Sequence, residues 1–162
     1  MVIERLFTIL TSLACILDGA HAQAAPSPER RAILDATRPL AAKEAGQVVR
    51  IKVDRLNVDR GYAMLVGELV GAPGKEMNWG YANSCHADLD KMLWVVLRKQ
   101  RGNWRVLHME ICASEPPYWY IGHYGGYIWP CGVYAGLDEG KLEAECRSGV
   151  IYARPPARKR NQ

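Results

Sequence analysis

Residues 91–112 read KMLWVVLRKQRGNWRVLHMEIC, and this stretch decides the fold. Two runs rich in Val, Leu, Ile and Trp flank the pair Arg101-Gly102, a pattern that predicts a β-hairpin with a two-residue loop. In that register Gln100 faces Asn103, and the pairing continues in step along both strands. Both faces of this hairpin are apolar, so each face needs a covering layer.

Continued pairing in this register assigns each hairpin side chain to a face. The first face is expected to carry Leu93, Val95, Leu97, Trp104, Val106, His108 and Glu110. The second face is expected to carry Trp94, Val96, Leu107, Met109 and Ile111.

A helix is predicted ahead of the sheet. Ser27-Pro28-Glu29 combines a capping hydroxyl, a proline suited to the first turn and an acidic residue that complements the helix dipole. Pro39 is expected to end or kink this helix, and Gly46 to close the segment. Its apolar stripe is expected to consist of Ile33, Leu34 and Leu40.

Two further strands lie between the helix and the hairpin. Val49, Ile51 and Val53 alternate with polar residues, which predicts a strand with one wet face, and a shift in the apolar phase predicts a bulge near Asp54-Arg55. Residues 62–70, YAMLVGELV, predict a strand buried on both sides. The fold class is therefore α+β: an N-terminal helix packed on a four-stranded antiparallel meander sheet, followed by a disulfide-stapled aromatic C-terminal segment.

Residues 1–22 have the features of a signal peptide. An apolar run of twelve residues, Leu6–Leu17, precedes Ala20-His21-Ala22, which fits a cleavage site, so we expect a mature chain that begins near Gln23. The run is shorter than the roughly 20 residues that a transmembrane helix needs. Ser12-Leu13-Ala14-Cys15 loosely resembles a lipoprotein signal, which is a second reading. Both readings predict export to the periplasm or beyond.

Four cysteines remain after residue 22: Cys85, Cys112, Cys131 and Cys146. An even number in an exported chain predicts two disulfides, for which three connectivities exist. The hairpin register places Cys112 close to the segment that carries Cys85. It therefore favours Cys85–Cys112 and leaves Cys131 to pair with Cys146.

The net charge of +4 does not indicate a nucleic-acid partner. Arg154, Arg158, Lys159 and Arg160 supply much of the basic charge and lie in the end of the chain, RPPARKRNQ. We expect residues 23–146 to form a single domain and residues 147–162 to form a solvated, Pro-containing basic tail. Oligomeric state is left open.

Residues 113–130 hold an unusual density of aromatic side chains, Pro and Gly. They can serve as a lid over the second face of the sheet, which is the favoured reading, or as a solvent-facing binding platform. In an extended segment Trp119 and Trp129 are expected to point inward. The candidate binding surface is then Tyr118, Tyr120, His123, Tyr124 and Tyr127.

No catalytic, cofactor or metal-binding residues are assigned. His108-Met109-Glu110 followed by Pro130-Cys131 resembles part of the zinc deaminase signature, but Tyr134 stands where that signature has its second cysteine. His108 and Glu110, two apart on one strand, can form a general acid/base pair in a cleft. A partnered, half-buried His and Glu is the favoured interpretation.

Several segments together resemble a group of small exported bacterial proteins without assigned activity, of the broad cystatin/NTF2-like class. The resemblance covers Arg30 to Tyr134 and rests on RRAILDATRPL, VRIKVDRLNV, GYAMLVGEL, LWVVLRKQRGNWRVLHMEI and YGGYIWPCGVY. It implies a curved antiparallel sheet wrapped around a helix, and it implies no particular activity because this fold hosts many functions.

Three functions follow from these observations. The first is an exported, non-enzymatic binding module for a protein or a cell-envelope component, with an inhibitor or immunity-type protein as its most concrete form. The second is a small NTF2-like enzyme with an acid/base site at His108 and Glu110. The third is a structural envelope protein without a discrete ligand.

Overall fold

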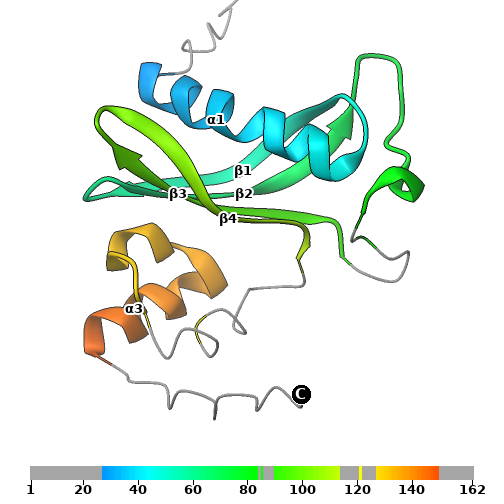
Figure 1. The fold of residues 1–162 in the computed structure, drawn as a ribbon. Coiled ribbons are helices and arrows are strands. Elements are labelled where there is room, and N and C mark those ends of the chain that lie inside the picture. Colours follow the sequence, from blue (N-terminus) through cyan, green and yellow to red (C-terminus); the bar gives the residue numbers. More distant parts are fainter. Residues whose placement is uncertain (1–26, 84, 86–89, 114–120, 122–126, 150–162) are drawn as a thin grey trace, which may run out of the picture.

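The computed structural model describes residues 27–83, 85, 90–113, 121 and 127–149. Helix α1 precedes four antiparallel strands that pair in the order β1-β2-β3-β4. Helix α1 covers one face of the sheet, and the short helices of the C-terminal segment lie on the opposite side (Figure 1). The elements are α1 (Pro28–Ala45), β1 (Val49–Asp59), β2 (Tyr62–Gly71), η1 (Trp79–Tyr81), β3 (Met92–Gln100), β4 (Asn103–Ala113), η2 (Cys131–Tyr134), η3 (Leu137–Gly140) and α3 (Lys141–Ser148). The predicted helix and meander sheet are confirmed.

Helix α1 begins and ends as the sequence predicts. The Ser27 hydroxyl accepts a hydrogen bond from the Arg30 backbone N–H, and Gly46 adopts the left-handed conformation that closes the helix. The helix nevertheless continues through Pro39, where an end or kink was expected. Pro39 lies on the exposed side, where solvent can satisfy the carbonyl that loses its intrahelical partner. Leu40, expected on the buried stripe, is 42% exposed.

A bulge between Val53 and Arg55 interrupts the pairing of β1 with β2, as predicted. Gly67 lies opposite this bulge, and a Cβ atom there would be only 2.2 Å from the Lys52 carbonyl oxygen. The close approach of the two backbones therefore excludes a side chain at position 67.

The hairpin loop at Arg101-Gly102 is confirmed, with φ angles of 48° and 83° that suit a type I′ turn. The expected faces are wrong beyond Val106. Leu97 pairs with Val106, but Val96 pairs with His108, so Leu107 is an extra residue that exchanges the faces of the rest of β4. Met109 and Ile111 consequently pack on the α1 side, whereas His108 and Glu110 lie opposite Val96 and Trp94.

Two apolar clusters lie on the two sides of the sheet. The first lies under α1 and includes Ile33, Ala41, Leu65, Leu93, Val95, Leu97 and Ile111. The second lies under the C-terminal helices and includes Met64, Trp94, Val96, Ile121, Trp129, Val133, Tyr134, Leu137 and Leu142. The need for cover on both hairpin faces is thus met from both ends of the chain.

The disulfides are Cys85–Cys112 and Cys131–Cys146, as the hairpin register favoured. Their Cα atoms are 5.6 Å and 5.5 Å apart, distances that are normal for disulfides. Disulfides of this kind suit an oxidising, extracellular environment. Within the described residues, no helix has the length and apolar character required to cross a bilayer.

Candidate binding site

The second face of the sheet is divided between a covered part and an open part. Helices η2, η3 and α3, called here the C-terminal module, cover the part of the face near the turn between β1 and β2. This module is anchored to β1 by side chains near the end of that strand. The Asn57 amide nitrogen donates to the carbonyl oxygens of Val133 and Ala135 at 3.0 Å and 2.8 Å, and the Asp59 carboxylate accepts from the Gly132 N–H at 3.0 Å.

Within the module, the Cys131–Cys146 disulfide joins η2 to α3. The Tyr127 hydroxyl donates to the Glu145 carboxylate at 2.7 Å, which ties the chain before η2 to α3 as well. These links hold the short helices together although neither η2 nor η3 is long enough to be stable alone.

An aromatic cluster joins the module to the sheet. The Trp94 ring, which comes from β3, lies 5.9 Å from the Trp129 ring in an edge arrangement. The Tyr134 ring lies 6.2 Å from Trp129 and 5.0 Å from Tyr127. Burial raises the pKa of the Tyr134 hydroxyl above its usual value, so it stays protonated throughout the physiological range. The cluster is a packing device, with one face closed by the sheet.

His108 and Glu110 lie on the strand surface beside this cluster. The His108 ring is 5.8 Å from the Trp129 ring. Burial, with a smaller effect from the charge of Glu44, raises the pKa of the Glu110 carboxyl. Both side chains are half-buried, so they are held at the border of the module.

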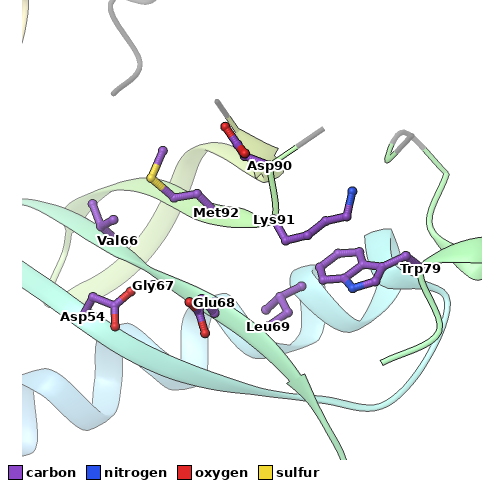
Figure 2. Close-up of a pocket in the computed structure, with 9 residues that line it drawn as sticks. All are labelled: Asp54, Val66, Gly67, Glu68, Leu69, Trp79, Asp90, Lys91 and Met92. Atoms are coloured by element: carbon purple, nitrogen blue, oxygen red, sulfur yellow. The ribbon is translucent and has the colours of Figure 1, made fainter. Parts of the chain in front are cut away.

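The open part of the second face contains a pocket of about 510 Å³ (Figure 2). This volume falls within the range of small-ligand and side-chain binding sites. Strands β1, β2 and β3 form its floor, and η1 contributes Trp79 at its side. Its lining residues are Asp54, Val66, Gly67, Glu68, Leu69, Trp79, Asp90, Lys91 and Met92.

The bulge in β1 shapes this pocket. Asp54 is the residue between the two registers, and it has no partner on β2 in the strand pairing. Its side chain is exposed and borders the pocket together with Glu68 from β2. The bulge therefore places a carboxylate where a regular strand would have continued the ladder.

The predicted binding surface is only partly described. Tyr127 is half-buried and packs against Tyr134 rather than standing free on a surface. Tyr118, Tyr120, His123 and Tyr124 lie outside the described residues, as does Trp119. Trp129 is buried, at 6% exposure, as the lid interpretation expects. Its expected contacts with Leu107 and Met109 are wrong, because Leu107 is 39% exposed and Met109 packs on the α1 side.

Sequence reasoning did not find the pocket. Asp54 was noticed only as a bulge residue, and Trp79 not at all, because the lining comes from three strands and a distant 3₁₀ helix. The one available signal was the phase shift at Asp54-Arg55, since bulges often mark functional edges of sheets. Among the described residues, no group of three or more His, Cys, Asp and Glu side chains is arranged to hold a metal ion.

The fold and site define a small disulfide-linked α+β domain with an open pocket on one face of its sheet. Comparison with known protein families, curated proteins and solved structures finds no match for this chain.

Proposed function

We propose that this chain is an exported, non-enzymatic binding module that recognises a protein or cell-envelope partner through the open part of its second sheet face. The observation that carries the proposal is the pocket of about 510 Å³ beside the C-terminal module. The pocket combines an apolar floor with charged groups on its rim, which is the composition of a recognition site.

Export, to the periplasm or beyond, is part of the proposal. It is supported by the signal-like residues 1–22 and by two disulfides in the described chain. Disulfides that fix both the β4 end and the C-terminal module preorganise the second face, which lowers the entropic cost of binding.

The most specific form of the proposal is an inhibitor or immunity-type protein that occupies a partner enzyme. The helix-on-sheet arrangement agrees with the resemblance to the cystatin/NTF2-like class, whose members include inhibitors as well as enzymes.

A second candidate function is a small enzyme that uses His108 and Glu110. The observation in its favour is that both side chains lie at the border of the aromatic cluster and that burial raises the pKa of Glu110. On this alternative, Glu110→Gln would abolish a turnover activity and leave partner capture intact. On the binding-module proposal, capture alone responds to changes in the pocket.

Affinity capture from the native cell envelope tests the proposed function. The exported chain is used as bait beside Glu68→Trp, which places a large side chain at the pocket mouth, where Glu68 is 52% exposed. We expect the parent chain to retain a specific partner and Glu68→Trp to retain at least about tenfold less, because steric blockage of a central contact removes most binding energy.

The matched control is Glu76→Trp, an exposed position outside the pocket lining that undergoes the same chemical change. It should retain the partner like the parent chain. Equal capture by the parent, Glu68→Trp and Glu76→Trp would contradict the proposal, as would failure of the parent chain to retain any partner.

A further inference from the structure

We propose that the pocket accepts a lysine side chain presented by the partner polypeptide, with its ammonium group among the rim carboxylates and its methylene stem against the apolar wall. This inference rests on the proposed function and deepens it by naming the chemistry that the partner presents.

The charge of the lining favours a cation. Carboxylates from three separate elements converge on the pocket: Asp54 from β1, Glu68 from β2 and Asp90 from the segment before β3. Lys91 is the one basic residue in the described lining. The lining therefore carries an excess of negative charge, which attracts a cationic group.

Two of the three carboxylates lack an ion pair within the described chain. Glu68 accepts a hydrogen bond from the Lys52 ammonium at 3.1 Å, and Lys52 approaches it from outside the lining. Asp54 and Asp90 have no basic group of the described residues within ion-pair distance. A compact ammonium group, with three N–H donors, suits separate carboxylates better than a planar guanidinium, which prefers one carboxylate in bidentate contact.

The apolar part of the pocket fits an alkyl stem. Val66 and Met92 are half-buried neighbours on β2 and β3, and the Trp79 indole stands at the side of the pocket (Figure 2). A lysine stem can lie along such a surface while its ammonium remains at the polar rim.

The chain itself shows that Trp79 tolerates an ammonium group nearby. The Lys91 nitrogen lies 5.6 Å from the centre of the Trp79 ring, within cation–π range, and its side chain runs toward the indole in Figure 2. The aromatic wall is therefore compatible with lysine chemistry and does not require a neutral ligand.

The test uses a short peptide as the probe. Acetyl-Gly-Lys-Gly-amide is titrated into the exported chain, and the Trp79 indole N–H resonance, assigned with a Trp79→Phe variant, is followed by NMR. The matched probe, acetyl-Gly-norleucine-Gly-amide, keeps the stem and lacks the charge. We expect saturable shifts with the lysine peptide, at least about fivefold weaker binding of the norleucine peptide, and weakening of the lysine peptide as salt is raised.

The matched variants separate pocket charge from net charge. Asp54→Asn combined with Asp90→Asn is expected to weaken the lysine peptide by about fivefold or more, whereas Glu76→Gln combined with Glu143→Gln, both outside the lining, should leave it unchanged. Equal binding of the two peptides, no saturable shift at Trp79, or equal effects of the two double variants would overturn the inference. If the lysine preference fails while Glu68→Trp still abolishes capture, the proposed function stands; if the lysine peptide binds but capture fails, the proposed function falls.

Discussion

Replacing Trp129 with alanine is expected to lower the free energy of unfolding by about 3–5 kcal/mol, as removal of large buried aromatic side chains usually does. Trp129 is buried and lies in ring contact with Trp94, His108 and Tyr134. Its loss leaves a cavity between β3 and the C-terminal module. The midpoint and slope of urea unfolding, monitored by far-ultraviolet circular dichroism, give the change.

The neighbouring Ile128→Ala is the control for this prediction. Ile128 is 51% exposed, so its truncation should change the free energy of unfolding by about 0.5 kcal/mol or less. Similar small losses for both variants would mean that Trp129 is not a core residue and that the lid interpretation of this segment is wrong.

Removal of the Cys131–Cys146 disulfide, by changing both cysteines to alanine, is expected to lower the free energy of unfolding by about 3 kcal/mol. The two cysteines are 15 residues apart, and the disulfide closes η2, η3 and α3 into one unit. In the chain-entropy model, a loop of this length restricts the unfolded state by this amount. The measurement is again urea unfolding, on protein recovered with Cys85–Cys112 intact.

Ser148→Ala, an exposed change two residues beyond Cys146, serves as its control and should remain within about 0.5 kcal/mol of the parent. An unchanged midpoint in the double cysteine variant would show that the module is held by its side-chain contacts with β1 alone.

Much of the fold could be predicted because local chemistry determines it. Arg101-Gly102 supplies the positive φ angles that a two-residue hairpin loop needs, and Ser27 and Gly46 supply the two ends of α1. The disulfide pairing followed from the same hairpin, because pairing along β3 and β4 brings Cys112 near the segment before β3.

The register of β4 could not be predicted because both of its faces are apolar. Leu107 as an extra residue leaves an apolar pattern on either side, so hydrophobic alternation did not distinguish the bulged strand from a regular one. Pro39 likewise gave a wrong signal, because its cost depends on whether the lost hydrogen bond faces solvent or the core.

The pocket was beyond prediction for a different reason. Asp54, Glu68, Trp79 and Asp90 are separated in the chain and come together only through the meander and the long connection that follows β2. A single sequence contains no periodicity that links such positions. Trp129, by contrast, could be predicted as buried because the second face required apolar cover and few residues were available to provide it.

The central claim, that the partner binds the open part of the second sheet face, is tested most directly by site-specific photocrosslinking in the native envelope. A benzophenone amino acid is placed at position 68, in the pocket lining, or at position 40, on the opposite side of the molecule in α1. The account predicts one discrete adduct from position 68, with the same partner that affinity capture retains, and none from position 40. An adduct with that partner from position 40 and none from position 68 would contradict it.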